Sequence, residues 1–488
     1  MFLGIDIGTS AVKAVLVDPV GAIADQASAP LEVMRPAPLH SEQRPADWWA
    51  ATNLAVSSLM AEARAKTQAI GLSGQMHGAT LLDAADKPLR NAILWNDGRS
   101  GQECAELEAA VPESREITGN LAMPGFTAPK LLWVARHEPD LFSRIATVLL
   151  PKDYVRLRLT GEKASDMSDS AGTLWLDVAR RAWSDAMLAG CGLSDAQMPE
   201  LYEGNEITGT LRSELAEAWG MGCVPVAAGA GDNAAGAAGV GVINRGEALL
   251  SLGTSGVLFL ADDAYRPNPK DAVHTFCHCL PGLWHHMSVL LSAASCIDWA
   301  ARATGAGDAG ALLAEVEAGA PDPAELMFLP YLSGERTPHN DPDAKGVVFG
   351  LTHESGRAEL GQAVLEGVAF AFADGLDALA HTGAPIDAIS VIGGGARSGY
   401  WGKILSAVLN RPLIYREGAE AGPAYGAARL ARLAVTGEEP RDVCVSPPVR
   451  AVIEPEDRLV ARYADRRPVF QSLYANLRSL FKEASHDH

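Results

Sequence analysis

The sequence predicts an α/β protein made of two related domains. A strand–turn–strand segment, Gly4-Ile5-Asp6-Ile7-Gly8-Thr9-Ser10, begins the chain, and a similar one, Leu249-Leu250-Ser251-Leu252-Gly253-Thr254-Ser255, follows about half a chain later. At 488 residues the chain is too long for one core and fits two sizeable domains. Its 48 glycines suit the many turns of an α/β fold. We expect the two halves to close on one polyphosphate.

Composition excludes several classes of protein. With 40 basic and 60 acidic residues the net charge is −20, so we expect no nucleic-acid partner. No apolar run is long enough for a membrane span, and a strand begins almost at once, without a signal peptide. The seven scattered cysteines, an odd number, favour a reducing compartment. We therefore expect a cytoplasmic protein.

The first half reads as a meander of three strands followed by alternating helices and strands. Residues 44–47 mark the start of a helix over 48–65, with Asp47 as its N-cap. Polar loops follow buried strands at 74–78 and 95–99. The other expected elements of this half are strands at 2–6, 11–17, 21–28, 69–73, 79–83, 92–95 and 225–229, and helices at 102–111, 129–138, 139–146 and 233–241.

The pattern restarts after a boundary near residues 241–246. We expect an N-terminal sugar-binding domain over 1–244, a C-terminal nucleotide-binding domain over 245–436 and an accessory helical segment over 437–488. The expected elements beyond the second hairpin are helices at 292–304, 360–381 and 467–484 and a strand at 389–392.

Asp6 is the candidate metal ligand. It stands two residues before Gly8, at the end of a strand that meets a phosphate-type turn, where Mg²⁺ prefers a carboxylate beside waters and phosphates. An Asp here can also simply cap the turn. The second hairpin has Ser251 at the matching position, so only the first half offers this ligand. Lys13 is either a phosphate-neutralising residue or a solvated strand residue.

Asp232 is the candidate general base. Glycines flank it at a strand-to-helix junction, where a carboxylate can accept the proton of a substrate hydroxyl. Asp is also a favoured N-cap, and both roles can hold together. The surrounding glycine spacing resembles a dinucleotide fingerprint only weakly, because Ala234 replaces the third glycine.

Further loops suit nucleotide and sugar. Bare backbone at Gly393, Gly394 and Gly395, continuing into Ala396 and Arg397, lets a base or phosphate lie against the chain. In the first half, ligands of open α/β sheets usually bind at carboxyl strand ends. The residues that we expect to contact a polyol or sugar there are Gln75, Met76, His77, Trp95, Asp97, Asp232 and Asn233.

The sequence lacks one common nucleotide-binding motif and contains one run with metal-like residues. There is no Gly-x-x-x-x-Gly-Lys-Ser/Thr phosphate loop, so the nucleotide prediction depends on the paired hairpins. The run His274–Cys279 with His285 and His286 has zinc-like residue types, but its spacing matches no usual closed site and it alternates like a strand.

The chain resembles the FGGY carbohydrate kinases over nearly its whole length. Gly125-x-Thr127-x-x-Lys130-Leu131-x-Trp133 matches one family signature, and Gly334-Glu335-Arg336-Thr337-Pro338 through Gly350-Leu351 resembles the other. The family's fold implies two ribonuclease-H-like, actin-like domains with a central cleft. The stretches 73–78, 94–99, 150–154 and 231–233 are most similar to members that phosphorylate D-xylulose.

The resemblance implies roles for the candidate residues. Asp232 would be the base, Met76 and His77 would contact the sugar, and Asp6 would serve Mg²⁺. The two Gly-Thr-Ser tips would hold phosphates, and residues 394–397 would line the adenosine site. The implied activity is transfer of the γ-phosphoryl group of ATP to O5 of D-xylulose, a step of D-xylose catabolism, by an enzyme of class EC 2.7.1.17. The family habit and the accessory segment favour a homodimer.

Two alternatives stay open at this point. The chain could phosphorylate another ketose or polyol of the same family, because the Gln75–His77 loop favours D-xylulose without proving it. It could instead be an actin-like or chaperone-like switch ATPase. The sugar-type loops and the lack of an evident peptide-binding appendage weigh against this second alternative.

Overall fold

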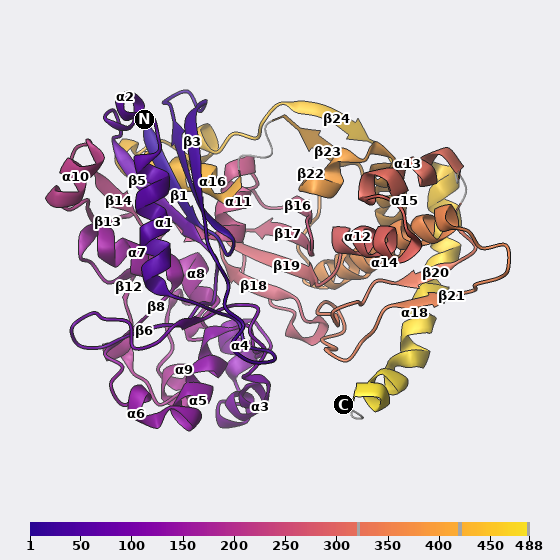
Figure 1. Ribbon diagram of the computed structural model, residues 1–488, viewed down its shortest axis with the longest axis horizontal. Helices are drawn as coiled ribbons and strands as arrows, with labels where there is room; N and C mark the ends of the chain where they lie inside the picture. Colours follow the sequence, from indigo (N-terminus) through magenta and orange to yellow (C-terminus); the bar gives the residue numbers. More distant parts are fainter. Residues whose placement is uncertain (320–322, 418–421, 486–488) are drawn as a thin grey trace.

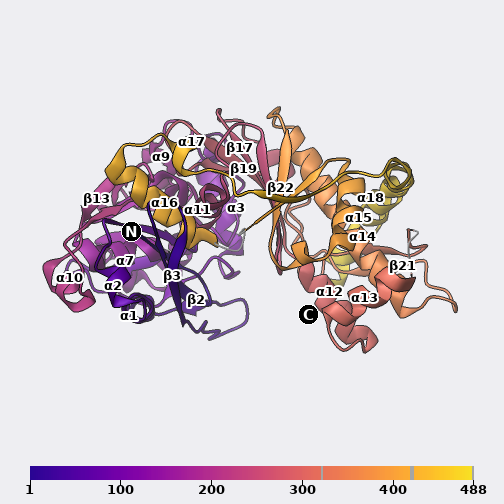
Figure 2. The same ribbon diagram turned by 90° about the horizontal axis from the view of Figure 1, so that it is seen from above.

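Two mixed sheets, one in each half of the chain, organise the molecule. The computed structural model describes residues 1–319, 323–417 and 422–485. The first half of the chain forms one lobe and most of the second half forms the other (Figures 1 and 2). No helix within the described ranges is both long and apolar enough to cross a membrane.

The first sheet has strand order β13-β14-β5-β1-β2-β3, with β15 paired to β5. Strands β1, β2 and β3 form the predicted antiparallel meander, whereas β5 runs parallel to β1. β1 and β5 are almost completely buried, which explains their continuous apolar sequence. The strands span Phe2–Ile7 (β1), Ala11–Val17 (β2), Ile23–Pro30 (β3), Ala69–Gly74 (β5), Ile207–Thr210 (β13), Pro225–Ala227 (β14) and Ala230–Gly231 (β15).

The second sheet repeats this plan in the order β18-β19-β17-β16-β22-β23-β24. Its antiparallel run β16-β17-β19 corresponds to β1-β2-β3, and β22 lies parallel to β16 as β5 lies parallel to β1. The predicted relation between the halves is thereby confirmed. The strands span Glu247–Leu252 (β16), Gly256–Asp262 (β17), His274–Cys277 (β18), Trp284–Leu290 (β19), Ala388–Ile392 (β22), Leu413–Arg416 (β23) and Val449–Ile453 (β24).

Helices and short hairpins surround the sheets. In the first half the helices are α1 (Pro45–Ser57), α2 (Ala61–Arg64), α3 (Gly101–Ala110), α4 (Ser114–Thr118), α5 (Thr127–His137), α6 (Pro139–Phe142), α7 (Pro151–Thr160), α8 (Met167–Ala171), α9 (Asp185–Gly190), α10 (Ser213–Trp219) and α11 (Asp232–Val240). In the second half they are α12 (Ala294–Thr304), α13 (Ala309–Gly319), α14 (Arg357–Ala380), α15 (Gly399–Leu409), α16 (Gly422–Thr436), α17 (Pro440–Val443) and α18 (Asp457–Ser485).

The remaining short strands and 3₁₀ turns lie between these elements. The strands are β4 (Glu42–Gln43), β6 (Thr80–Leu82), β7 (Ala92–Ile93), β8 (Thr147–Leu149), β9 (Ala164–Asp166), β10 (Leu176–Asp177), β11 (Ala182–Trp183), β12 (Glu200–Tyr202), β20 (Met327–Leu329) and β21 (Val347–Phe349). The turns are η1 (Asp195–Gln197), η2 (Pro269–Asp271) and η3 (Gly394–Arg397).

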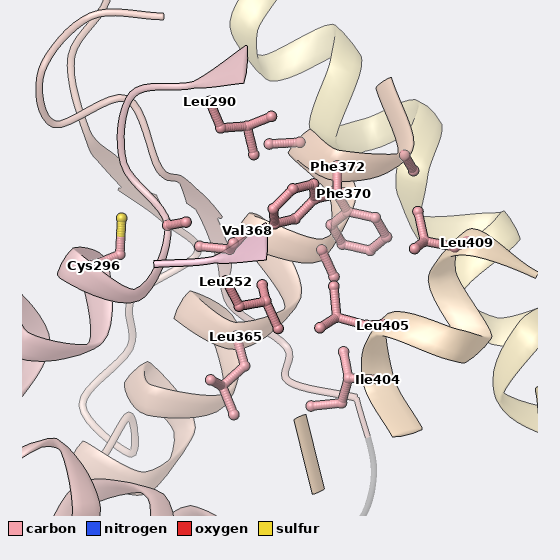
Figure 3. Close-up of a cluster of buried hydrophobic side chains, with 14 of the residues drawn as sticks. Leu252, Leu290, Cys296, Leu365, Val368, Phe370, Phe372, Ile404, Leu405 and Leu409 are labelled. Atoms are coloured by element: carbon pink, nitrogen blue, oxygen red, sulfur yellow. The ribbon is translucent and has the colours of Figure 1, made fainter. Parts of the chain in front are cut away.

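The core of the second half forms around α14. Leu252 and Leu290 from the sheet meet Phe370 and Phe372 of this helix, and Leu405 of α15 closes the cluster (Figure 3). These side chains are completely buried. The apolar face predicted for 360–381 is therefore the face on which the second sheet and α15 pack.

Helix α16 crosses back from the second half onto the first sheet (Figures 1 and 2). Gly4 and Gly71 are in register on β1 and β5. A Cβ atom at Gly4 would lie 1.8 Å from the Ala424 carbonyl oxygen, and one at Gly71 would lie 1.9 Å from that of Ala427. The two glycines therefore let the helix lie directly on the strands.

Several local predictions were wrong, among them the helix expected over 139–146, which ends at Phe142. The helix predicted over 48–65 is α1 followed by α2, and position 44 holds the N-cap, with Asp47 in the first turn bonded to the Arg44 side chain. The last helix begins ten residues earlier than predicted, at Asp457, with Pro468 inside it. The segment after 436 also contains β24, whose backbone completes the edge of the second sheet beside β23. The domain limits stay a prediction.

Candidate active site

The candidate site lies where three strands of the first sheet end. In the parallel register Asp6 pairs with Ser73, and Ala230 of β15 pairs with the same Ser73. Residues that follow these positions therefore share one edge of the sheet. That edge receives the Gly8–Ser10 turn, the Gln75–His77 loop and Asp232, as predicted from the carboxyl ends of the strands.

Asp6 and Asp232 are close enough to influence each other's charge. Burial raises the pKa of Asp6 to about 6. Burial, together with the negative charge of Asp6, raises the pKa of Asp232 to about 7. One carboxylate oxygen of Asp6, Oδ1, is buried without a hydrogen-bond partner. A buried, unpartnered carboxylate oxygen beside a second carboxylate fits a hard cation such as Mg²⁺.

Lys13 lies directly opposite Asp6 on β2. Paired residues of antiparallel strands project to the same side of the sheet, and the Lys13 charge partly offsets the rise in the Asp6 pKa. The pairing places an ammonium group beside the carboxylate. Its predicted contact with phosphate stays a prediction.

Asp232 is the first residue of α11 rather than its N-cap, which is Gly231. Its Oδ1 accepts hydrogen bonds from the Asn233 backbone N–H at 2.7 Å and from Asn233 Nδ2 at 2.9 Å. Asn233 therefore holds one oxygen of Asp232. The N-terminal end of the helix also adds a partial positive charge beside the carboxylate.

Thr9 joins the phosphate turn to the sugar loops. Its hydroxyl donates to Gln75 Oε1 at 3.1 Å and accepts from Trp95 Nε1 at 3.0 Å. Gln75 Nε2 in turn donates to Gln43 Oε1 at 2.9 Å. The predicted residues Thr9, Gln75 and Trp95 are thus brought together, and Gln43 is a further member of this group that the sequence reading missed.

His77 has one defined tautomer. Burial lowers its pKa to about 3, so the ring is neutral. Its Nδ1 lies 2.6 Å from the Gly172 carbonyl oxygen, which can only accept, and therefore carries the proton. Nε2 is left as an acceptor. Lys130 Nζ donates to the His77 carbonyl oxygen at 2.9 Å and fixes the backbone, which has φ 69° here.

Met76 connects His77 to the base. A Cβ atom at Gly231 would lie 2.9 Å from Met76 Cγ, so the thioether side chain packs against the residue that precedes Asp232. Glycine at 231 is required by this close approach. Met76, His77 and Asp232 therefore follow one another along the sheet edge.

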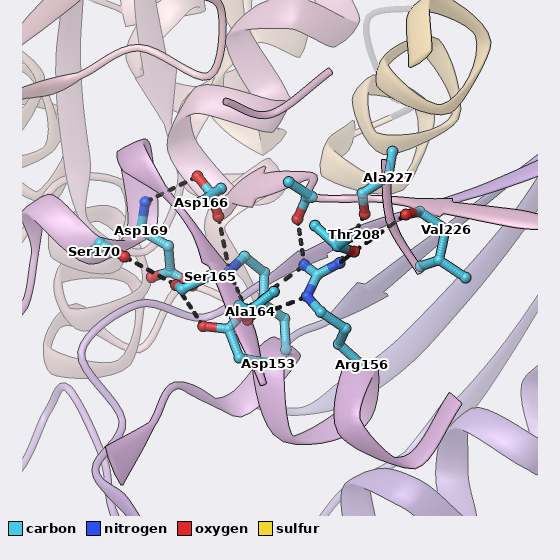
Figure 4. A network of polar contacts seen from close by, with 12 residues as sticks. Asp153, Arg156, Ala164, Ser165, Asp166, Asp169, Ser170, Thr208, Val226 and Ala227 are labelled. Atoms are coloured by element: carbon cyan, nitrogen blue, oxygen red, sulfur yellow. Dashed lines mark hydrogen bonds and ion pairs between the residues drawn. The ribbon is translucent and has the colours of Figure 1, made fainter. Parts of the chain in front are cut away.

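A fully buried network of charges supports the strand that leads to Asp232 (Figure 4). Lys152 Nζ contacts carboxylates of Asp153, Asp166 and Asp169 at 2.6, 2.7 and 3.0 Å. Ser168, beside these residues, accepts a hydrogen bond from the Gly231 backbone N–H at 3.1 Å. Since buried charges are tolerated only when paired, this network fixes the backbone that leads to Asp232.

Arg156 extends the same network to the neighbouring strand. Its guanidinium donates to the Ala227 carbonyl oxygen at 2.8 Å and to that of Ala228 (Figure 4). It also donates to Thr208 Oγ1 at 2.7 Å. The sequence analysis assigned no role to Arg156, because its position in helix α7 does not indicate which distant backbone groups it contacts.

Asp97 is engaged by other protein groups. Its Oδ2 accepts from the Ser41 N–H at 2.6 Å and from Arg99 Nη2 at 2.7 Å, and Oδ1 accepts from Arg99 Nε at 2.9 Å. With only 2% of Asp97 exposed, this carboxylate orients the loop that carries Trp95. Its predicted contact with sugar stays a prediction.

The second hairpin and the triple glycine share one pocket. A cavity of about 450 Å³ is lined by Gly253, Thr254, Gly394, Gly395 and Arg397, with Trp401 at its floor. A Cβ atom at Gly395 would lie 2.6 Å from the Trp401 ring, and Gly393 has φ 94°. Glycine is needed at both positions, and the pocket has the size of a nucleoside site. Ser255 follows in the hairpin, and Ala396 lines the opposite side of η3.

The His274–Cys279 run lies buried on β18 and just beyond it, facing β19. His274 stacks on Phe276, and His285 stacks on Phe259. In the described part of the chain, no group of three or more His, Cys, Asp or Glu residues could hold a metal ion. The zinc-like composition is therefore explained by core packing.

Together these features define a class of protein. Two related domains supply two buried carboxylates at one sheet edge, one of them with an unpartnered oxygen that suits a cation, together with a polar loop and a separate nucleoside-sized pocket. Phosphoryl transfer requires positioning and charge neutralisation of this kind. The molecule is a kinase with the ribonuclease-H-like, actin-like fold.

Comparison with known proteins gives the family. Residues 1–239 match the N-terminal domain and residues 248–435 the C-terminal domain of the FGGY family of carbohydrate kinases. The chain therefore belongs to the FGGY family. Kinases of this family use ATP, so this chain is a carbohydrate kinase that acts on a sugar with ATP.

Individual relatives match over the full length. The chain is 55% identical to the xylulose kinase of Escherichia coli over 98% of this chain and 99% of the relative. It is 54% identical to that of Klebsiella pneumoniae over 98% and 100%. The crystal structure of a "xyloylose kinase" from Brucella ovis matches with a TM-score of 0.95 at 52% identity, covering 98% of this chain and 99% of the other. The xylulose kinase of Rhodospirillum rubrum matches with a TM-score of 0.90 at 29% identity, over 99% of both chains.

Proposed function

We propose that this enzyme transfers the γ-phosphoryl group of ATP to O5 of D-xylulose, giving D-xylulose 5-phosphate and ADP. The observation that carries the proposal is the meeting of Asp232, Met76 and His77 at one sheet edge beside Asp6. The relatives that match over 98% of the chain at 54–55% identity are xylulose kinases, which supports D-xylulose as the sugar.

Asp232 is the proposed base. The C5 hydroxyl of the sugar gives its proton to the Asp232 carboxylate while its oxygen forms a bond to the γ-phosphorus. The bond between that phosphorus and the β,γ-bridging oxygen breaks, and ADP leaves. The pKa near 7 suits this role, because a base is most effective when its pKa lies near the working pH.

The other residues position the two substrates and neutralise the charge of the phosphates. Met76 and His77 bind the sugar, and the neutral His77 ring offers Nε2 as an acceptor for a sugar hydroxyl. Gly253, Thr254, Gly394, Gly395 and Arg397 bind the nucleotide in their shared pocket, and Ala396 lies among them in η3. Gly8, Thr9, Ser10 and Lys13 face the transferred phosphate.

Asp6 would hold Mg²⁺ through its unpartnered buried oxygen. The ion would supply charge neutralisation for the phosphate oxygens. The same neutralisation would remove the repulsion that now raises the Asp232 pKa. Neutralisation of the Asp6 charge would therefore favour the ionised form of Asp232 when substrates are bound, while burial, the larger cause of its raised pKa, would remain.

The test is coupled ADP release with Mg-ATP, comparing D-xylulose with D-ribulose, L-ribulose, L-xylulose, glycerol and no sugar. Release that depends on D-xylulose supports the proposal. A preference for another polyol would retain the mechanism and replace the substrate. Release that is equal with every sugar and without sugar would contradict the roles of Met76, His77 and Asp232 and favour a switch ATPase.

A further inference from the structure

One cation near the sugar loops has no counter-ion. Arg336 lies in the loop between β20 and β21 of the second half. Its backbone N–H donates to Glu335 Oε1 at 2.8 Å. Over residues 1–319, 323–417 and 422–485, no ion pair or hydrogen bond engages its guanidinium group. Five N–H donors are therefore free for a ligand.

The guanidinium lies against the first half, beside the sugar loops. A Cβ atom at Gly125 would be 3.5 Å from Arg336 Nη2 and 2.6 Å from the Trp95 carbonyl oxygen. Burial lowers the pKa values of His77 and His274, and the nearby Arg336 charge lowers both further. Lys130 Nζ donates to the carbonyl oxygens of both Gly125 and His77, so the place where Arg336 meets Gly125 and Trp95 is also close to the His77 backbone, although Arg336 comes from the other half of the chain.

No carboxylate of the described residues forms an ion pair with Arg336. Glu335, its neighbour in sequence, uses Oε1 to accept from the Leu291 N–H at 3.0 Å and from the Arg336 backbone N–H, its Oε2 is buried without a hydrogen-bond partner, and burial raises its pKa to about 8. Asp97 is paired with Arg99. Arg336 is half-buried, and a partly desolvated guanidinium without hydrogen-bond partners gains from the oxygen acceptors of a ligand.

The backbone around Arg336 is held rigidly. Its carbonyl oxygen accepts from the Asn340 N–H at 2.5 Å. The Thr337 N–H donates to the Val289 carbonyl oxygen at 3.2 Å, and Thr337 Oγ1 accepts from the Val289 N–H at 3.1 Å. The side chain is therefore presented from a fixed loop, as a binding residue requires.

The positions of Asp232, Met76, His77 and Arg336 indicate which end of the bound sugar lies near Arg336. Asp232 follows Gly231, Met76 packs on Gly231, and His77 comes next; the His77 ring contacts Phe126, which follows Gly125, the residue against which Arg336 lies. We infer that Arg336 binds the substrate by donating hydrogen bonds to oxygens at the end of the sugar remote from the reacting hydroxyl. If D-xylulose is the substrate, as proposed above, these are the C1 hydroxyl and the C2 carbonyl oxygen.

This assignment has a consequence for the two domains. Sugar held by His77 on one side and Arg336 on the other contacts both halves of the chain. Binding energy from the sugar then favours the closed arrangement in which phosphoryl transfer is shielded from water.

The experiment compares Arg336→Met, Arg336→Lys and the wild type. We expect Arg336→Met to raise the KM for D-xylulose about 10- to 100-fold, the range for lost hydrogen bonds to a charged group, with the KM for ATP within twofold. Arg336→Lys retains the positive charge but lacks the planar set of N–H donors, so its KM for D-xylulose should lie between those of the wild type and Arg336→Met. Arg411→Met, which removes an exposed guanidinium bonded only to Asn410, should leave both constants unchanged.

A second substrate makes the test specific. In the wild type, 1-deoxy-D-xylulose should have a higher KM than D-xylulose, and in Arg336→Met this ratio should approach one. An Arg336→Met or Arg336→Lys enzyme with unchanged sugar KM, or with the wild-type ratio between the two sugars, overturns the inference. If the wild type prefers another polyol, the same variants are tested with that polyol and with its analogue that lacks the hydroxyl remote from the phosphorylated one. A failure of D-xylulose as the substrate is thereby distinguished from a failure of Arg336 as a binding residue.

Discussion

Two carboxylates at one sheet edge receive different support from their neighbours. Asp232 is held by the backbone and side chain of Asn233, whereas Asp6 has a buried oxygen without a partner. The first arrangement suits the role of base proposed for Asp232, and the second leaves an oxygen of Asp6 open for the proposed cation. Their separate roles therefore follow from local hydrogen bonding rather than from residue type.

Asp232→Asn should lower kcat by about 10²- to 10⁴-fold, the range that general-base catalysis contributes. The amide cannot take the hydroxyl proton, but its size is unchanged, so the KM for ATP and the melting temperature should stay close to wild type. Coupled ADP release measures the rate, and Asp195→Asn on the surface turn η1 is the matched control. Turnover within a fewfold of wild type would remove Asp232 from the role of base.

The pKa of Asp232 predicts a pH dependence. The carboxyl must be ionised to act, so kcat/KM for the sugar should fall as pH decreases below about 7. Asp6→Asn removes the negative charge that helps to raise this pKa, so the titration of Asp232 should move to lower pH. Carboxyl ¹³C NMR of the metal-free wild type and variant measures the shift directly. Identical midpoints would show that Asp6 does not act on Asp232.

At the scale of elements, helix α16 decides where α11 and the first sheet sit. A Cβ atom at Gly426 would lie 1.8 Å from the Ala235 carbonyl oxygen of α11. Gly4 and Gly71 allow the equally close contact of α16 with β1 and β5. Small residues at these positions thus form one continuous contact from the C-terminal part of the chain to the helix that begins with Asp232.

Gly426→Ala should destabilise the protein by about 1–3 kcal/mol, because the added methyl must push two backbones apart. It should also lower kcat, since α11 carries Asp232. Gly236→Ala is the control on α11: no atom lies within 4 Å of its added Cβ, so helix propensity should stabilise the protein by about 0.5–1 kcal/mol. Urea unfolding measures both. Equal stability of the two variants would contradict the close contact.

At the scale of the whole molecule, a shared core joins the two halves. Met76 and Phe126 from the first half pack with Phe259 and Phe276 from the second. Asn120 lies at this junction: its Nδ2 donates to the Thr275 carbonyl oxygen at 2.9 Å. The domains are therefore linked on the side of the sugar loops as well as through α16.

Asn120→Ala should weaken this junction. It leaves the buried carbonyl of Thr275 without its donor, which costs about 1–3 kcal/mol. Hydrogen exchange should become faster along β18 while β1 and β5 stay protected. Asn476→Ala, which removes only an exposed bond within α18, is the control and should change stability by less than about 0.5 kcal/mol. Unchanged exchange in β18 would argue against the linking role.

Much of the site followed from sequence alone, because its signals are local. A Gly-Thr-Ser turn between two apolar strands determines its own hairpin, and buried strands determine that Gln75–His77 and Asp232 meet at their carboxyl ends. Tertiary structure decided the rest, since it depends on contacts between distant segments. The return of α16 to the first sheet, the support of Gly231 by Ser168 and the placement of Arg336 against Gly125 each join residues separated by many elements. The hydrophobic periodicity of the sequence does not predict such long-range contacts, because the energy of a buried charge or a close backbone contact depends on the partner that folding brings to it.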